Sequence, residues 1–225
     1  HTRNDKRVCM ATLIAPHWAL TAAHCTQETP IQETIVSGQP YALRVNGADY
    51  QIAALEIHPD YLSGAVLQGV DLALIRLDRD VPDLVPVQLN RQPDELDKVA
   101  LLLGWGHTGP GTLGRQGNDG KFRRANNAVS SATQWLSFLF DDPRVPGNHA
   151  LDLEGVPGLG DSGGPALVEG PQGLQVLGVA LGELETAAGR EHQGMYGATE
   201  IYERVYLHLD WIDRILRDVP AVPKS

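Results

Sequence analysis

The sequence contains little cysteine, comparatively few positive charges and no long hydrophobic run. Its 18 Lys and Arg residues face 28 Asp and Glu residues, and the net charge of −10 argues against a nucleic-acid partner, because phosphates favour basic surfaces. No apolar segment approaches the roughly 18 residues of a membrane-spanning helix, so we expect no membrane span. Two cysteines in 225 residues exclude a dense disulfide framework, and a chain of this length can bury a sizeable core without one.

Glycine and proline are frequent and divide the chain into short segments. The 24 Gly and 15 Pro residues separate short β-rich runs, a pattern typical of an all-β protein built from antiparallel strands. The Gly-rich segment 106–121 is predicted to be a loop without a functional signal of its own. One amphipathic helix is predicted at the end of the chain, where apolar residues recur at helical spacing. These residues are Leu207, Leu209, Ile212, Ile215 and Leu216.

Three polar residues stand in the order histidine, aspartate, serine: His24 in an AAHC segment, Asp71 in DLAL and Ser162 in GDSGGP. A serine hydroxyl is a poor nucleophile at its free pKa, so catalysis needs a base within hydrogen-bond reach and a third group that orients the base. Asp71 heads an apolar run, where an unpaired carboxylate would be costly to bury, and His24 offers it a partner. We therefore predict that these three residues form a catalytic triad.

The GDSGG segment also matches the nucleophile elbow of α/β-hydrolases, which need a catalytic histidine downstream of the serine. His192 and His208 are available for that role. The elbow must lie between a strand and a helix, however, and this chain shows little helical periodicity before its end. We therefore prefer the triad with the upstream histidine.

Residues 22–25, 71–74 and 160–165 resemble the three signature blocks of the trypsin/chymotrypsin family of serine proteases. Weaker matches extend the resemblance over nearly the whole chain; they are Trp18, His58-Pro59, Gly104-Trp105-Gly106, Tyr202 and Trp211-Ile212. The resemblance implies an all-β, chymotrypsin-like fold of two six-stranded antiparallel β-barrels with a C-terminal α-helix. It also implies a first barrel and connector over residues 1–97 and a second barrel with the helix over residues 98–225, which together form one peptidase domain.

The resemblance further implies a secreted serine endopeptidase that hydrolyses peptide bonds through an acyl-enzyme intermediate. Ser162 is expected to attack the scissile carbonyl, while His24 moves the proton and Asp71 orients the imidazole. The N–H groups of Gly160 and Ser162 are expected to form the oxyanion hole. The expected partner is a protein or peptide substrate, and a proteinaceous inhibitor or propeptide is a further candidate. The alternative is a latent, zymogen-like protein that keeps the protease fold and acts by binding.

The two cysteines also fit the family. There, the cysteine after the catalytic histidine pairs with an earlier one, so the resemblance implies a disulfide between Cys9 and Cys25. Such a bond implies an oxidising compartment, and we expect a secreted or periplasmic protein; two reduced, buried thiols are the alternative. The other usual cysteines are missing, so the chain resembles the sparsely bridged, bacterial-type branch of the family.

Asp161, just before the nucleophile, matches the family's aspartate that pairs with the amino terminus freed by zymogen cleavage. Cys9 lies only eight residues after His1, whereas the family has a longer segment there, so we expect that an amino-terminal segment is missing from the sequence. Asp161 is therefore predicted to be the activation residue, either without its usual partner or bonded locally.

Substrate preference depends on the pocket that the resemblance implies. Val156, six residues before the nucleophile, is expected at the pocket floor, where a valine favours apolar substrate side chains. Leu181, Gly182 and Glu183 are expected on one wall. Glu200 is expected on the other wall, where a carboxylate favours a basic side chain. The sequence leaves the choice between apolar and basic substrates open.

The place of Glu200 depends on which tyrosine matches the one that the family has near its carboxyl end. Aligning Tyr202 puts Glu200 in the pocket wall, and the spacing to Trp211 favours this alignment. Aligning Tyr196 instead makes Glu200 an ordinary loop charge.

No cofactor and no metal are expected. Some family members hold calcium in the first barrel, but Glu28, Glu33 and Asp49 are too scattered for the closely spaced oxygen ligands that calcium prefers.

Overall fold

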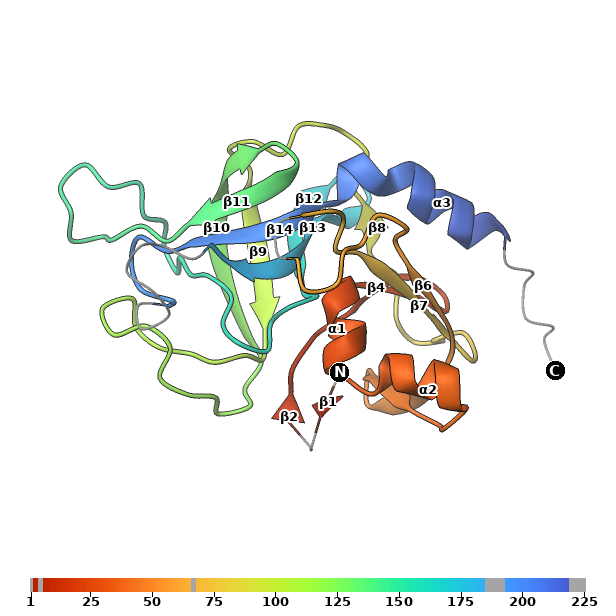
Figure 1. Ribbon diagram of the computed structural model, residues 1–225. Coiled ribbons are helices and arrows are strands. Elements are labelled where there is room, and N and C mark those ends of the chain that lie inside the picture. Colours follow the sequence, from red (N-terminus) through yellow and green to blue (C-terminus); the bar gives the residue numbers. More distant parts are fainter. Residues whose placement is uncertain (1, 4–5, 66–67, 185–192, 219–225) are drawn as a thin grey trace.

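The computed structural model describes residues 2–3, 6–65, 68–184 and 193–218, and strands dominate it (Figure 1). The strands are β1 Thr2–Arg3, β2 Lys6–Arg7, β3 Thr12–Ala15, β4 Trp18–Thr21, β5 Ala42–Val45, β6 Ala48–Ile57, β7 Ala73–Leu77, β8 Gln88–Leu89, β9 Val99–Gly104, β10 Arg123–Ala132, β11 Trp135–Leu139, β12 Pro165–Gly170, β13 Gly173–Glu183 and β14 Thr199–Arg204. The helices are α1 Ala23–Glu28, α2 Ile31–Ser37 and α3 Leu209–Asp218, and a 3₁₀ helix at Val205–His208 leads into α3. The predicted all-β class with a terminal helix is confirmed.

The larger of the two main sheets, which we call the second sheet, is a closed barrel. Its strands follow the order β12-β9-β10-β11-β14-β13, and β12 also pairs with β13, which closes the ring. The pairings within the ring are antiparallel, and β8 adds a short parallel pairing to β13. Buried apolar side chains fill the interior, where the rings of Phe138 and Tyr202 meet edge to face at 5.0 Å between centroids. The six-stranded antiparallel barrel expected here is confirmed.

The first sheet has five strands in the order β3-β4-β7-β6-β5. Within the part of the chain that the structure describes, its edge strands β3 and β5 do not pair, so this sheet is a half-barrel where we expected a closed six-stranded one. Helix α2 covers the opening, because Ile31 is fully buried in one cluster with Leu13 of β3 and Leu43 of β5. A helix side chain thus shares a buried cluster with residues of the two strands that do not pair.

Neither α1 nor α2 follows from the sequence pattern, which predicts little helix before the end of the chain. The two helices have six and seven residues, which is shorter than the window of about 11–18 residues in which helical periodicity becomes visible. Helix α2 ends at Gly38, whose φ of 71° lies in the left-handed region and whose N–H donates to the carbonyl oxygen of Thr34.

A hydrophobic cluster joins the two sheets to the terminal helix. It combines Trp18 and Leu74 of the first sheet with Val176 and Val179 of β13, and Ile212 of α3 is fully buried among them. Helix α3 thus extends from the second sheet along the first (Figure 1), and the helix predicted there is confirmed. Among the described helices, none combines the length and the apolar character that a bilayer crossing requires.

Candidate active site

His24 and Asp71 meet at one edge of the first sheet. Strands β4 and β7 pair antiparallel, with Thr21 opposite Ala73, so the residues just after β4 and just before β7 come together. The imidazole Nδ1 of His24 lies 2.7 Å from Oδ2 of Asp71, and the backbone N–H of His24 donates to Oδ1 at 2.9 Å. With both carboxylate oxygens engaged, Asp71 fixes the plane of the ring and directs Nε2 away from itself.

The pKa of His24 is raised above its ordinary value of 6.5. Burial alone lowers this pKa, but the hydrogen bond and the negative charge of Asp71 outweigh burial, and Glu28 adds a smaller contribution. The imidazole is therefore a stronger base than a free histidine.

Ser162 lies in the loop before β12, which is held from two sides. The carbonyl oxygen of Ser162 accepts the N–H of Met10 at 2.7 Å. The next residues pair with β13, where Gly163 donates to Ala180 and Ala180 donates to Gly164, both at 2.8 Å. These bonds fix the backbone of the loop between the two sheets.

Ser162, His24 and Asp71 line one broad cleft, together with Gly160 and Leu181. The serine Oγ donates to the carbonyl oxygen of Leu181 at 3.4 Å, a long bond that a rotation about χ1 breaks at low cost. No hydrogen bond joins Ser162 to His24 within the described residues. The structure thus brings the three predicted triad residues into one cleft and links two of them directly.

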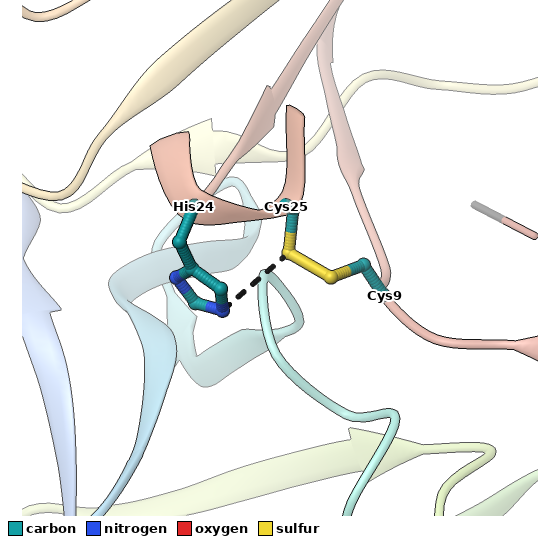
Figure 2. Close-up of side chains that lie close together, drawn as sticks. All are labelled: Cys9, His24 and Cys25. Atoms are coloured by element: carbon teal, nitrogen blue, oxygen red, sulfur yellow. Dashed lines mark hydrogen bonds between the residues drawn. A yellow bond between two sulfur atoms is a disulfide. The ribbon is translucent and has the colours of Figure 1, made fainter. Parts of the chain in front are cut away.

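A disulfide ties the histidine segment to the serine loop. Cys9 and Cys25 are bonded, with their Cα atoms 5.9 Å apart, and Figure 2 shows the bond beside the imidazole of His24. Cys25 follows His24 in α1, whereas Cys9 precedes Met10, whose N–H holds Ser162. The alternative of two reduced thiols is not what the structure shows.

The same three side chains form a compact cluster of potential metal ligands. Sulfur atoms of Cys9 and Cys25 and a ring nitrogen of His24 lie within 4.8 Å of one another. Both sulfur atoms belong to the disulfide, so neither is the thiolate that binds zinc. We therefore assign no metal to this cluster.

Asp161 is bonded locally. Its Oδ1 accepts the N–H groups of Trp105 and Gly106, both at 2.7 Å, and its Oδ2 accepts the N–H of Gly158 at 2.8 Å. Burial raises the pKa of this carboxyl, and the three N–H groups and the charge of Arg115 partly offset that rise. Of the two alternatives for Asp161, the structure shows local bonding, with backbone N–H groups as the donors.

The Gly104-Trp105-Gly106 segment is explained by this contact. A Cβ on Gly106 would lie 2.7 Å from Cγ of Asp161 and 2.5 Å from the carbonyl oxygen of Leu159, and a Cβ on Gly104 would also meet the Asp161 carboxylate. Glycine at both positions lets the backbone approach the carboxylate closely enough to donate its N–H groups.

The N–H groups of Gly160 and Ser162, which we expected in an oxyanion hole, donate to no acceptor among the described residues. Gly160 has a φ of 97°, a conformation that other residues rarely adopt. Both donors belong to the segment that Asp161 anchors and border the cleft that contains Ser162.

A buried glutamate lies behind Asp71, and sequence analysis did not find it. Glu203 of β14 accepts the backbone N–H of Asp71 at 3.1 Å and lies 3.1 Å from Nε2 of His208. His208, the downstream histidine of the elbow alternative, is therefore paired with a carboxylate and not with Ser162, while His192 lies outside the described residues. Glu203 stands in a short strand with two other charged residues, Glu200 and Arg204, so no local signal in the sequence set it apart.

The two glutamates expected on the pocket walls face each other. Strands β13 and β14 place Glu183 directly opposite Glu200, whose side chain is only 1% exposed, so Glu200 is not an ordinary loop charge. Gly182 precedes this pair in β13, and the Leu181 carbonyl lies in the cleft beside Ser162. Val156 does not line that cleft; it borders a second hollow.

Arg115 lies against the two glutamates, although the loop that carries it was expected to have no functional residue. Its Nη2 donates to Oε1 of Glu200 at 2.9 Å and lies 3.4 Å from Oε2 of Glu183. Burial raises the pKa of Glu200 to about 8; the charge of Arg115 opposes the rise, and Glu183 and Asp161 add to it. Two acidic residues expected in one buried pocket imply a cation, which is the signal that could have identified Arg115.

The chain is similar to known proteins over most of its length. A family model described as Trypsin matches residues 1–212, which includes both sheets. The chain is similar to the trypsin of Saccharopolyspora erythraea, with 31% identity over 177 residues, or 74% of this chain and 73% of the relative. It is 28% identical over 219 residues to chymotrypsin-like elastase family member 1 of Macaca fascicularis, which covers 92% of this chain and 78% of the relative. Granzyme M of Homo sapiens is 30% identical over 171 residues, or 72% and 65%.

Replacing Asp161 tests the anchor of the serine loop. Asp161→Ala leaves three N–H groups without their acceptor, and each buried unsatisfied donor costs about 1–3 kcal/mol. We expect the free energy of unfolding to fall by at least ~2 kcal/mol in urea titrations, with faster hydrogen exchange at Gly106 and Gly158. Asp152→Ala, at an exposed aspartate, is the control, and equal stability of the two variants contradicts the anchor.

The raised pKa of Glu200 gives a pH dependence of stability. Because the folded state keeps this proton up to about pH 8 while an unfolded glutamate loses it near its ordinary pKa of 4.5, stability falls as the pH rises through this window. The slope is at most about 1.4 kcal/mol per pH unit. Glu200→Gln cannot lose a proton there, so we expect a flatter curve of unfolding free energy between these limits. Parallel curves for the two proteins contradict this assignment.

Proposed function

The chain belongs to the trypsin family of serine proteases and is a serine endopeptidase. From this premise we propose that it cleaves peptide bonds with Ser162 as nucleophile, His24 as base and Asp71 as the residue that orients the base. The pairing of His24 with Asp71 carries the proposal, since both carboxylate oxygens hold the histidine at the cleft that also contains Ser162.

The reaction has two stages. Ser162 Oγ turns from the Leu181 carbonyl toward Nε2 of His24, gives up its proton and attacks the scissile carbonyl carbon. The protonated imidazole, stabilised by Asp71, then donates this proton to the leaving amine, and an acyl ester remains on Ser162. Water, deprotonated by the same histidine, then attacks the ester, and the histidine returns that proton to Ser162 Oγ as the acid is released. Asp71 keeps the proton on Nδ1 throughout, so that Nε2 is free to act.

Gly160 and Ser162 supply the oxyanion hole in this proposal. Their N–H groups have no acceptor among the described residues and border the cleft, and Asp161 anchors the segment that carries them. Donors that are already oriented stabilise the developing negative charge, and loss of one such donor costs about 2.7–4 kcal/mol in the transition state. We do not adopt the alternative of a latent, binding-only protein, because His24 and Asp71 keep a bonded geometry that binding alone does not require.

We also propose that the protein works outside a reducing compartment, as a secreted or periplasmic enzyme. The disulfide between Cys9 and Cys25 supports this, since such bonds persist in oxidising surroundings. In this proposal the segments 1–97 and 98–225 act as one peptidase domain. A propeptide or proteinaceous inhibitor that occupies the cleft stays a prediction.

A fluorophosphonate probe tests the nucleophile, because it reacts covalently with an activated serine. We expect labelling of the native chain, an adduct located at Ser162 by mass spectrometry, and no labelling of Ser162→Ala. Ser130→Ala, at an exposed serine of β10, is the matched control and should be labelled like the native chain. Labelling that persists in Ser162→Ala refutes the assignment.

Replacing Asp71 tests the orientation of the base. Asp71→Asn is expected to lower kcat by about four orders of magnitude, the loss known for this change in the family's triad. Since the neutral imidazole is the base, kcat/KM rises with pH through the pKa of His24, above pH 6.5 in the native enzyme. The variant loses the contribution of Asp71 that raises this pKa while burial still lowers it, so its acid limb moves to lower pH.

Asp80→Asn is the control for that experiment. Asp80 also contacts a histidine at 2.7 Å, but the histidine is His17, away from the cleft. Its pH profile should match that of the native enzyme. An acid limb that stays in place in Asp71→Asn contradicts the role of Asp71.

A further inference from the structure

Arg115 occupies the place that the family resemblance gives to a substrate side chain, and the inference rests on the proposed function. Its guanidinium contacts both expected acidic walls of the pocket and the residue that follows the expected floor. Nη2 donates to the carbonyl oxygen of Pro157, next to Val156, at 3.1 Å, and to Glu200 at 2.9 Å, and it lies 3.4 Å from Glu183. The side chain is only 12% exposed. A basic group therefore already stands where a substrate's would stand.

The two glutamates make this pocket unsuited to an apolar side chain. Glu183 and Glu200 are buried, with side chains 7% and 1% exposed, and buried carboxylates need a cation or a retained proton. Arg115 supplies the cation. An apolar side chain in its place would leave Glu183 without a cation and the carboxyl group of Glu200 without its hydrogen-bond donor, whereas a guanidinium or ammonium group would replace both contacts. The charge of the walls thus outweighs the apolar floor at Val156.

The hydrogen bonding of the Arg115 side chain is incomplete among the described residues. Arg115 Nε is buried and has no hydrogen-bond partner among the described residues. A buried donor without an acceptor destabilises the arrangement that holds it, so the guanidinium is held less firmly than its contacts to the two glutamates suggest.

The loop that carries Arg115 is joined to its surroundings by few backbone bonds and by the side chain of Arg115 itself. Backbone bonds join Thr108 to residues 116–117 and close the base of the loop, and Leu113 near its tip is 63% exposed. Backbone bonds from Arg115 to Gln193, at 3.1 Å, and from Tyr196 to Gly111, at 2.8 Å, hold it against the facing segment. A loop with an exposed tip and few such bonds opens at a low free-energy cost compared with the barrel.

We propose that Arg115 is an internal stand-in for the basic side chain of a substrate, and that cleavage after Arg or Lys requires the loop 106–121 to withdraw it from Glu183 and Glu200. Glu200 then determines the substrate preference. A basic substrate binds only the molecules whose pocket is open. Arg115 therefore reduces the apparent affinity for basic substrates in proportion to the fraction of molecules with an open pocket.

The kinetic test uses peptides that differ only in having Arg or Leu before the scissile bond. If Arg115 fills the pocket in roughly nine molecules of ten, its removal in Arg115→Ala raises kcat/KM for the Arg peptide about tenfold, and the Leu peptide gains nothing comparable. Arg115→Lys keeps the charge beside the glutamates, so the fold is retained, and with fewer donors it is expected to give a smaller rise. Glu200→Gln added to Arg115→Ala should remove the gain.

Arg123→Ala is the matched control, since Arg123 begins β10, just after the same loop, and is exposed and paired with Asp119. It should cleave both peptides like the native enzyme. If neither Arg115 variant cleaves the Arg peptide faster than this control, or if both peptides gain equally, Arg115 is a structural residue and the proposal is overturned.

A binding measurement separates this inference from the proposed function. Methylguanidinium chloride is expected to raise the Tm of Arg115→Ala more than that of the native chain and of Arg123→Ala, at ionic strength matched with NaCl, because only that variant has the pocket open. Equal shifts in the three proteins overturn the inference even when Ser162 is labelled. Absence of labelling at Ser162 refutes the hydrolytic mechanism instead, and the methylguanidinium shifts then decide on the pocket alone.

Discussion

The site depends first on one buried carboxylate. Asp161 accepts N–H groups from both ends of the region around the serine, namely Trp105 and Gly106 at the end of β9 and Gly158 in the serine loop itself. Because these bonds converge on the residue next to Ser162, the position of the nucleophile follows from that of Asp161. The glycines at the end of β9 matter for the same reason: a side chain there would push the backbone away from the carboxylate. The loop is therefore oriented from within the second barrel, before any substrate arrives.

Buried negative charge is the second constraint on this barrel. Asp161, Glu183 and Glu200 lie close enough for the charges of the first two to raise the pKa of the third, and Arg115 opposes them. The three carboxyl groups are accommodated in different ways: by backbone N–H groups, by a guanidinium and by a retained proton. Because Arg115 lies near all three carboxyl groups, the pocket and the serine loop share one electrostatic environment. A change of charge in the pocket therefore changes the electrostatic potential at the serine loop.

Sequence alone predicts the parts of this structure whose signal is local or periodic. His24 and Asp71 stand in short sequence motifs, the all-β class and α3 follow from patterns repeated over many residues, and the closed barrel was expected from the family resemblance. Arg115 has no such signal, because its partner Glu200 lies 85 residues away and the need for a cation arises only when the glutamates are buried together. The half-barrel was not predicted for a similar reason. The burial of Ile31 with residues of the two edge strands is a tertiary contact, and the short helix α2 leaves no periodic signal in the sequence.

The bond between Cys9 and Cys25 makes the chemistry conditional on the surroundings. On one side it adjoins His24, and on the other it adjoins Met10, which holds the backbone of Ser162, so a single covalent link reaches residues anchored on different sheets. Both cysteines are also buried members of the hydrophobic cluster that joins the two sheets. Reduction would remove the covalent link between the segment that carries His24 and the segment that holds the backbone of Ser162, so in the proposed mechanism the base and the nucleophile would be held together by packing and hydrogen bonds alone.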